Sequence, residues 1–426
     1  MKLFSGDVMK KSFVLSVVLL PALLCGYTPT NMSWGYDRSF TRLSWLKKHV
    51  SLKSSFEYML RNRCYGPDQT RVSATQIYGT HESALAMLEG FEPGSDLNLL
   101  ANRVRATQDG VRGVFITSGS FKAWKASIDT SVNLSAITLP GDFTFSLHVP
   151  FQKMALQNVR WTSLTKNQSI HDAMVRSHIA ADQAGLQSFS QENASLNLGD
   201  VERVGLGDIS ALFDWKCCFL HNHNRLTEVL VNLRAGVSLP TGHVRNNDVA
   251  FDLSFGHDET FGIPLGAGLQ LGLSRYFAAG IDVGTLLLVR RSKEWRLMNG
   301  WGQTEHLFPR KGLATKEYGP EWDFTLYGRV REVVPGAFVV AGYQFIKHAD
   351  STLYEQDKSF SPSLINRSEQ VESCESHNLF CDITWSKKDA SLWRVSPEFA
   401  CGVKIPFGGK RMMSGVLVRV SGTVRF

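Results

Sequence analysis

Charged side chains occupy alternate positions in many stretches of this chain, with apolar residues between them. Arg419 and Arg425 lie in such a pattern near the end of the chain, and Lys125 and Asp129 lie in one much earlier. Successive side chains of a β-strand point to opposite faces, so the pattern predicts strands with one apolar and one charged face. The charged residues that we expect to line a shared lumen are Lys125, Asp129, Asp214, Lys216, Glu228, Arg234, Asp282, Arg290, Asp323, Arg329, Arg331, Arg394, Glu398, Arg419 and Arg425.

The chemistry available to such an interior is electrostatic. Unpaired charge in an apolar interior is costly, so the charges of both signs must be either hydrated or paired. A hydrated interior predicts a pore for small polar solutes, in which rings of charge set the selectivity. A narrow interior whose charges pair across strands predicts a barrel that is locked shut. The sequence leaves both interpretations open.

One cluster has residue types that hydrolysis requires. His348 and Asp350 are close in sequence, and His377 lies at the far end of the same predicted loop. A Ser–His–acid arrangement would need a nucleophile beside them, and the sequence has no nucleophile motif there. We therefore expect no catalytic residues, and an outer-membrane hydrolase is the least supported hypothesis.

The cysteines offer two further possibilities. Cys217 and Cys218 precede two histidines, and both residue types bind soft metals. Adjacent strand residues point to opposite faces and the histidines fall in a tight turn, so we expect no metal and no cofactor. A disulfide between Cys374 and Cys381 stays open, because an exported protein matures in an oxidising compartment.

The elements that must position these residues are strands. Alternation begins near residue 110 and continues to the last stretch, 413–426, which ends in an aromatic residue. After the first 25 residues, no apolar run approaches the roughly 20 residues that a transmembrane helix needs. A membrane protein without such runs must be a closed barrel, because lipid leaves exposed backbone groups unsatisfied. The predicted fold class is all-β: an antiparallel transmembrane β-barrel of about 12 strands, an even number, with a short, partly helical N-terminal segment.

Connection lengths give a second test. Bacterial barrels have short periplasmic turns and long outer loops. With the last strand ending in the periplasm, the inner turns are predicted at 138–141, 219–225, 275–277, 334–335 and 387–390, and the long outer loops at 152–205, 241–263, 292–319 and 351–376. This alternation requires a strand at 377–386. Two outer connections, 118–121 and 405–412, are short and depart from the pattern.

Three regions are predicted along the chain. Two lysines precede an apolar stretch of about a dozen residues, which is typical of a secretory signal peptide, and we assign it residues 1–26. Residues 27–110 are expected to form a periplasmic or plug-like segment with short helices at 80–89 and 95–104. Residues 111–426 are expected to form the barrel, with one more helical stretch at 170–181.

A soluble β-sandwich would give the same alternation of faces. The barrel is favoured by the export signal, by strands longer than the usual five or six residues or so, and by aromatic residues near strand ends. Those aromatic residues are Phe143, Phe151, Trp215, Phe277, Trp322, Trp385, Trp393 and Phe426. The formal net charge of +7 comes from dispersed Lys and Arg, not from the dense basic run of a nucleic-acid-binding protein. Anionic lipopolysaccharide or an anion-favouring pore accounts for it.

Short glycine-rich motifs connect the chain to a known group. Gly205-Leu-Gly-Asp-Ile209, and the stretch from Arg234 to Gly242 that ends in Pro-Thr-Gly, resemble motifs of outer-membrane barrels that transport fatty acids and aromatic hydrocarbons. That group includes the family named for the meta-pathway of phenol degradation. Residues 284–292 and 406–411 are similar to uncharacterised bacterial outer-membrane proteins. The resemblance covers roughly 205–426 and implies a barrel for passive uptake without catalytic residues.

We expect a porin-like passive channel for small solutes in the bacterial outer membrane. Its expected partners are the lipid bilayer, lipopolysaccharide and small solutes, and not nucleic acid. The alternative is a structural or adhesive surface barrel whose loops bind partners and which has no open pore. The sequence leaves the oligomeric state open.

Overall fold

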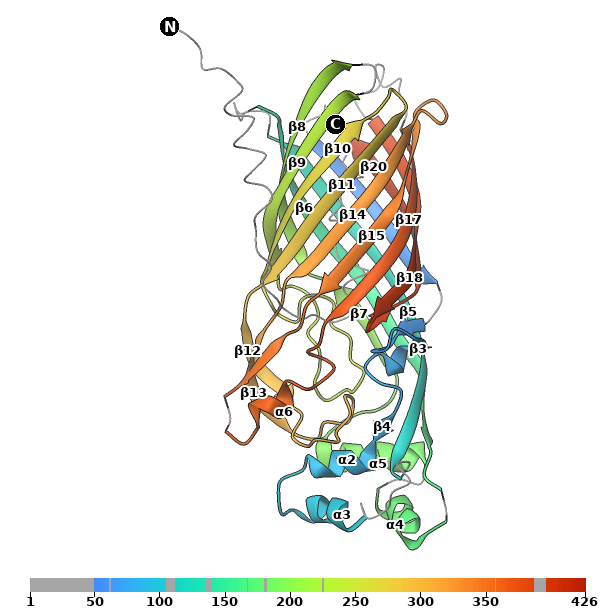
Figure 1. Ribbon diagram of the computed structural model, residues 1–426, viewed down its shortest axis with the longest axis vertical. Coiled ribbons are helices and arrows are strands. Elements are labelled where there is room, and N and C mark those ends of the chain that lie inside the picture. The colour runs from blue at the N-terminus through green and yellow to red at the C-terminus, as the bar shows by residue number, and fades with distance from the viewer. Residues whose placement is uncertain are drawn as a thin grey trace.

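A closed barrel of antiparallel strands dominates the computed structural model, which describes residues 50–60, 63–104, 112–134, 140–166, 168–179, 182–223, 226–356, 358–386 and 396–426. Within these residues, 12 strands form the barrel (Figure 1). They are β1 (Val50–Leu60), β5 (Val114–Asn133), β6 (Asp142–Ser163), β8 (Ile209–His223), β9 (Leu226–Leu239), β10 (Gly262–Gly272), β11 (Phe277–Leu288), β14 (Glu321–Arg331), β15 (Ala337–His348), β17 (Cys374–Ser386), β18 (Ser396–Lys410) and β20 (Val416–Arg425). The predicted fold class is confirmed.

The ring closes where the first and last of these strands meet. β1 pairs with β20 from Ser51, opposite Arg425, to Leu60, opposite Val416. The other edge of β1 pairs antiparallel with β5. Each described barrel strand therefore has a hydrogen-bonded partner on both sides, as a lipid environment requires.

The two faces of the barrel wall differ in character. On β1, Phe56 points outward and is 48% exposed, whereas the neighbouring Ser55 points inward and is 8% exposed. β14 and β17 show the same alternation of exposed apolar and buried polar residues. An apolar belt around a closed barrel is the arrangement of bacterial outer-membrane barrels, and the chain is one of them. Within the described ranges, no helix is long and apolar enough to cross a membrane.

The two ends of the barrel differ in the lengths of their connections. One end carries the C-terminus (Figure 1) and short connections such as 273–276. The opposite end carries the long connections 61–113, 164–208, 240–261, 289–320 and 349–373. Because periplasmic turns are short in such barrels, the C-terminal end is the periplasmic one. The strand that the predicted loop lengths require at 377–386 is present as β17.

The predicted start of the barrel at residue 111 is wrong. Val50–Leu60, expected in a separate N-terminal segment, is a full barrel strand. Its sequence places Leu52, Phe56 and Tyr58 outward and polar residues between them. The alternation of apolar and polar residues is therefore present in Val50–Leu60, but it extends over only this short stretch. The predicted signal peptide, residues 1–26, lies outside the described residues.

The short outer connection predicted at 118–121 is also wrong. The residues on both sides of it belong to one strand, β5, which continues through Gly119. The register between β5 and β6 shifts between Ser118 and Ser120, and a β-bulge of this kind interrupts the alternation as a turn would. The prediction divided β5 into two strands and omitted β1, and these two errors offset each other in the predicted number of strands. The connection expected at 405–412 is likewise shortened, because β18 continues to Lys410.

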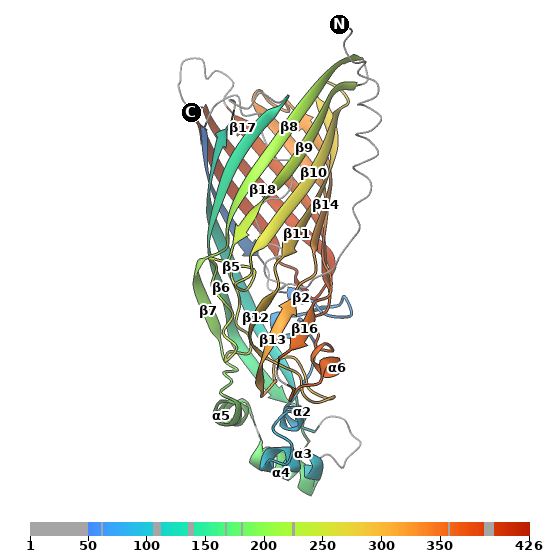
Figure 2. The same ribbon diagram turned by 90° about the vertical axis from the view of Figure 1, so that its left-hand side faces the viewer.

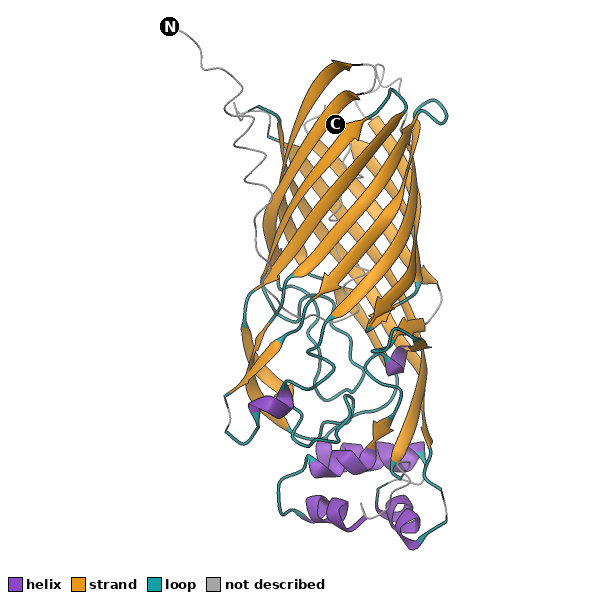
Figure 3. Ribbon diagram, viewed as in Figure 1, coloured by secondary structure: helices purple, strands orange, loops and turns teal. Residues whose placement is uncertain are grey.

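A cap of smaller elements continues the barrel at its long-loop end (Figures 1 and 2). The long strands β5 and β6 extend into it, and Figure 3 shows helices gathered at its far end. The elements of the cap are β2 (Arg63–Tyr65), β3 (Arg71–Ser73), η3 (Ala74–Gln76), β4 (Glu82–Ser83), α2 (Ala84–Glu89), α3 (Asp96–Val104), α4 (Ile170–His178), α5 (Gln183–Ala194), β7 (Val201–Leu206), β12 (Arg291–Arg296), β13 (Lys311–Glu317), β16 (Thr352–Glu355), α6 (Pro362–Ile365) and β19 (Met412–Met413).

The helices expected from the sequence are present, but the two expected in the N-terminal segment do not lie in the periplasm. α2, α3 and α4 match the stretches 80–89, 95–104 and 170–181. α2 begins after Ser83, whose side chain accepts a hydrogen bond from the backbone N–H of Ala86. All three helices lie at the long-loop end (Figure 1). The prediction that the N-terminal segment 27–110 is periplasmic is therefore wrong for its described residues after β1, because β1 carries the chain across the membrane before them.

The cap and the barrel share one apolar core. Met87 of α2, Phe115 of β5 and Leu186 of α5 are fully buried in it. The same cluster includes Leu156 and Leu417, which belong to the barrel strands β6 and β20. The cap is thus packed onto the barrel wall and does not hang from it by loops alone.

The position of β1 in the wall can be tested with an outward charge. An Arg near the middle of the bilayer costs about 2–4 kcal/mol in a barrel, so Phe56→Arg should lower the free energy of unfolding from lipid vesicles by about that amount. Phe56→Leu keeps the face apolar and should cost much less. Leu99→Arg, on an exposed position of α3, should change the free energy little. Equal effects of the two Arg variants would contradict the placement of β1 in lipid.

Candidate functional site

A polar cavity occupies the periplasmic half of the barrel. Its volume is about 180 Å³. β1, β5, β6, β8, β9, β17, β18 and β20 all contribute to its wall. Seven of the residues expected to line a lumen lie there: Lys125, Asp129, Asp214, Arg234, Glu398, Arg419 and Arg425. The strand closure described above is what brings residues so far apart in sequence around one space.

Ion pairs span the cavity wall from strand to strand. Arg234 of β9 lies next to Asp214 of β8, with 2.5 Å between Nε and Oδ1, and both side chains are almost fully buried. Arg419 of β20 reaches two carboxylates, Glu57 of β1 at 3.4 Å and Asp382 of β17 at 3.3 Å. Arg419 thus links three strands around the point at which the barrel closes.

Further pairs lie toward the periplasmic end. The Arg425 guanidinium is 2.6 Å from the Glu398 carboxylate, across β20 and β18. Asp129 and His148 are hydrogen-bonded across β5 and β6. Arg331 and Glu228, outside the cavity wall, form another ion pair between β14 and β9. Pairing of this kind offsets the cost of removing charges from bulk water.

The charges that face the cavity are balanced. Among the described residues in its wall, five are Lys or Arg and five are Asp or Glu. The cations are Lys53, Lys125, Arg234, Arg419 and Arg425, and the anions are Glu57, Asp129, Asp214, Asp382 and Glu398. Serine and threonine hydroxyls fill much of the remaining surface. The cavity is therefore strongly polar and close to neutral.

Other expected lumen residues are buried inside the barrel but outside the cavity wall. Lys216, Asp282, Asp323 and Arg329 are all almost inaccessible. The Arg329 guanidinium lies 5.3 Å from the centre of the Phe338 ring. The Asp323 carboxylate accepts hydrogen bonds from Gln344 at 2.7 Å and from Thr325 at 2.9 Å. This part of the interior is packed more tightly than the cavity.

One of the expected lumen residues lies elsewhere, and another is outside the described residues. Arg290 lies beyond the end of β11, its side chain is 64% exposed, and it pairs with Glu317 of β13. The prediction for Arg290 is wrong, because the alternation was extended past the last residue of the strand. Arg394 lies outside the described residues. Conversely, Lys53 and Glu57 were missed, although their alternation with the apolar residues of β1 is the same signal.

The outer end of the barrel interior has a different character from the inner end. Phe121, Met154, Leu156 and Leu417 are buried there and belong to the shared apolar core. The loop 243–258 lies against this end, where the Gln152 side chain donates to a backbone carbonyl of that loop at 2.7 Å. A small apolar pocket of about 50 Å³ remains between the loop and the strands. The wet, mixed interior expected from the sequence is therefore confined to the inner part.

The residues considered for hydrolysis do not come together. His348 points inward, with its Nε2 atom 2.6 Å from the Glu321 carboxylate. His377 points outward, where its Nδ1 atom is 2.7 Å from the Tyr343 hydroxyl. Asp350 accepts a hydrogen bond from a backbone N–H. The two histidines lie on opposite faces of the wall, so these residues form no catalytic group.

The cysteine questions are resolved for the described residues. Cys374 and Cys381 are both free thiols. They are seven positions apart on β17 and point to opposite faces. No group of His, Cys, Asp and Glu in the described part of the chain is placed to hold a metal ion.

Two buried side chains in the cap have pKa values far from their ordinary ones. The Glu82 carboxylate and the His306 imidazole lie 4.0 Å apart and are almost inaccessible. Burial raises the pKa of Glu82 to about 8 and lowers the pKa of His306 to about 3. Both groups are therefore mostly neutral at pH 7. The contact between β4 and the segment around residue 306 is thus a contact between two uncharged side chains.

Comparison with known proteins supports the fold. No family model matches the chain, and no curated protein matches it in sequence. Among solved structures, the chain is similar to the COG4313 outer membrane channel from Pseudomonas putida F1, with a TM-score of 0.52 and 10% identity over 92% of this chain and 100% of that chain. It also matches the transport unit of the autotransporter AIDA-I from Escherichia coli, with a TM-score of 0.36 and 8% identity over 94% and 99% of the two chains. A third match is the TodX deltaS2S3 mutant monoaromatic hydrocarbon channel, with a TM-score of 0.39 and 8% identity over 95% and 96%.

The first of these similarities shows a shared fold. The predicted resemblance to outer-membrane barrels of the transporter type is confirmed at the level of the fold.

The stability of the barrel should depend on both partners of the Arg234–Asp214 ion pair being present together. Removing one partner of a buried ion pair costs about 3–5 kcal/mol, whereas replacing both with apolar residues is often neutral. We expect Arg234→Met to lower the free energy of unfolding in urea by about that amount. Arg234→Met combined with Asp214→Leu should recover most of the loss. A single variant as stable as the parent would mean that water in the cavity already solvates Asp214.

The cap should loosen as pH rises. Because the pKa of Glu82 is raised in the folded cap, its contribution to stability is fully present below the ordinary value of 4.5 and is lost as pH rises to about 8. We expect α2 and β4 to exchange amide hydrogens faster at pH 9 than at pH 5, after correction for intrinsic rates. Glu82→Gln should remove most of this difference, and Glu92→Gln, at an exposed position, should not. An unchanged pH dependence in Glu82→Gln would contradict the assignment.

Proposed function

We propose that the protein is a passive channel for small polar solutes across the outer membrane. The observation that carries the proposal is the balanced, hydroxyl-rich cavity inside the periplasmic half of the barrel. A barrel that served only as a scaffold could fill this space with apolar side chains at lower cost, because buried charges must be paired to be tolerated. A polar space of about 180 Å³ suits small hydrophilic solutes and water.

The balance of charge indicates weak ion selectivity. Five cations face five anions in the cavity wall, so the average potential along this part of the interior is small. Each ion pair nevertheless narrows the space, which favours a low conductance. The solute must also pass the apolar outer end, where the cap covers the strands. We therefore propose that small molecules pass slowly through a narrow path, and that the barrel is not a wide pore for bulk electrolyte.

The second candidate is a surface barrel without an open pore. It is favoured by the number of ion pairs across the wall and by the packed core that joins the cap to the barrel. In this case the cap would be the functional surface, and the paired charges would lock the barrel. The predicted signal peptide at 1–26 and contact with lipopolysaccharide belong to both candidates and stay proposals.

Single-channel recording with altered charge tests the first candidate. Arg419→Gln leaves four cations against five anions in the cavity wall. One unit of charge at short range changes the relative permeability of cations to anions by about twofold to fivefold in salt solution. We expect the reversal potential in a KCl gradient to shift in the cation-selective direction by the corresponding amount.

A matched double variant provides the control. Arg419→Gln combined with Asp382→Asn restores equal numbers, four of each, and should return the reversal potential toward that of the parent. If the parent opens but Arg419→Gln leaves the selectivity unchanged, the cavity is not on the ion path. If the refolded parent never opens over a wide range of voltages, the second candidate replaces the first.

A further inference from the structure

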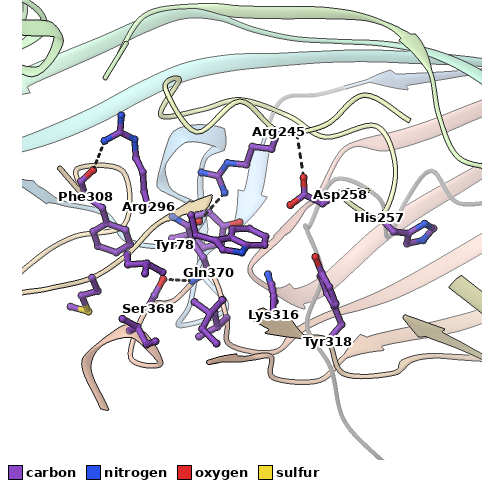
Figure 4. Close-up of a pocket in the computed structure, with 16 residues that line it drawn as sticks. Tyr78, Arg245, His257, Asp258, Arg296, Phe308, Lys316, Tyr318, Ser368 and Gln370 are labelled. Atoms are coloured by element: carbon purple, nitrogen blue, oxygen red, sulfur yellow. Dashed lines mark hydrogen bonds between the residues drawn. The ribbon is translucent and has the colours of Figure 1, made fainter. Parts of the chain in front are cut away.

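A second pocket, with both charged and apolar walls, lies in the cap (Figure 4). It shares no lining residue with the cavity in the barrel and has a volume of about 30 Å³. It lies between the loop 243–258, the sheet of β12, β13 and β16, and the segment 365–371. Tyr78, Trp295 and Phe308 give it aromatic walls. The channel function proposed above assigns it no role.

The most unusual group in this pocket is Lys316 of β13. Its side chain is only 7% exposed, and its Nζ atom lies 5.1 Å from the ring centre of Trp295 and 5.2 Å from that of Tyr318. Within the described residues, it makes no ion pair and no hydrogen bond. Burial lowers the pKa of Lys316 to about 8, so the ammonium is still mostly charged at neutral pH. A buried cation that lies against aromatic faces, attracted by an Asp258 carboxylate that already pairs with Lys293, is costly unless a further group satisfies it.

Two more donors in the pocket wall lack partners. Trp295 Nε1 and Arg245 Nε are buried and have no hydrogen-bond acceptor among the described residues. The rest of the Arg245 guanidinium is held in place, because Nη1 donates to the Gln370 side chain at 2.8 Å. Figure 4 shows Lys316 and Arg245 entering the pocket from opposite sides. The pocket thus contains buried donors that make no hydrogen bond within the described part of the chain.

The charges around the pocket are mainly positive. Asp258 is the carboxylate in the described wall, and it is already paired with Lys293 at 2.6 Å. Arg296 is also satisfied, because it donates to backbone carbonyls and to Asp248. His257 is bound to the Asp208 carboxylate at 2.5 Å. What remains available to a ligand is the cation of Lys316 and the donors of Arg245 and Trp295.

We propose that this pocket binds a small carboxylate anion. A space of about 30 Å³ holds roughly two water-sized groups, which matches the two oxygens of a carboxylate. Such a planar anion accepts hydrogen bonds from Lys316, Arg245 and Trp295, and the aromatic walls contact its short apolar end. The proposal does not depend on the channel function, because binding at this site needs no open pore.

Acetate binding to the refolded full chain in detergent micelles tests the proposal. Binding of ¹³C-labelled acetate is followed by NMR line broadening at pH 6.5, where Lys316 is charged. A ligand of this size should bind with a dissociation constant of about 0.1–10 mM. Lys316→Met keeps the packing on the rings but removes the charge, and it should weaken acetate binding about tenfold or more. Arg290→Met removes an exposed cation nearby and should leave binding unchanged.

The neutral analogue acetamide separates charge from shape and should bind at least tenfold more weakly than acetate. Equal affinity for acetate in Lys316→Met and the parent would overturn the proposal, as would equal binding of acetamide or no binding at 100 mM acetate. Chloride that competes as well as acetate would overturn the assignment of a carboxylate. Folding of Lys316→Met is checked by the shift in gel migration that a folded barrel shows on heating. If that shift is lost, Trp295→Phe, which removes only the indole donor, replaces Lys316→Met and should weaken acetate binding about threefold or more. Conductance of the same samples is recorded separately, so a closed channel and an empty pocket are distinguishable.

Discussion

Lipid offers the polypeptide backbone no hydrogen-bond partners, and the whole molecule depends on that constraint. Every strand in the membrane must pair on both sides, so the sheet must close. Closure here means that β1 meets β20, which brings Glu57 near Arg419. The face toward lipid must then be mainly apolar, and polar side chains of the wall such as Ser55, Asp214 and Arg419 turn inward. The polar cavity is a consequence of the closed sheet before it is an adaptation to any solute.

Charges that turn inward must still be stabilised, and this second requirement shapes the cavity. Arg234 and Asp214 face each other on neighbouring strands, and Arg419 lies between carboxylates of two strands. The pairs hold the strands in register and keep the cavity nearly neutral. They also narrow it. The same interactions that stabilise the barrel therefore narrow the space inside it, so in the proposed channel stability and conductance would be linked.

The sequence predicts what depends on local periodicity and fails where distant contacts decide. Loop lengths were enough to require the strand at 377–386, and alternation was enough to place Arg419 and Arg425 on the inner face. The partners of those arginines depend on the register between strands, which periodicity does not contain. Arg290 shows the opposite error, since its alternation continues past the end of β11. The donors of the cap pocket come from β12, β13 and the loop 243–258, and no periodic signal in the sequence shows that these three segments meet.

The longest strands show where the membrane ends. A tilted strand of about 9–11 residues spans the bilayer, and β6 has 22 residues, so about half of it stands in water. Along its membrane half, outward residues such as Phe151 are apolar. Beyond Asn158, which has a φ of 56°, outward Arg160 is exposed and inward Trp161 is buried in the cap core. Asp200 accepts the backbone N–H groups of Asn158 and the next residue at this bulge. Beyond the membrane, the strand thus turns the opposite set of side chains toward the core, and a fixed alternation of faces misses that exchange.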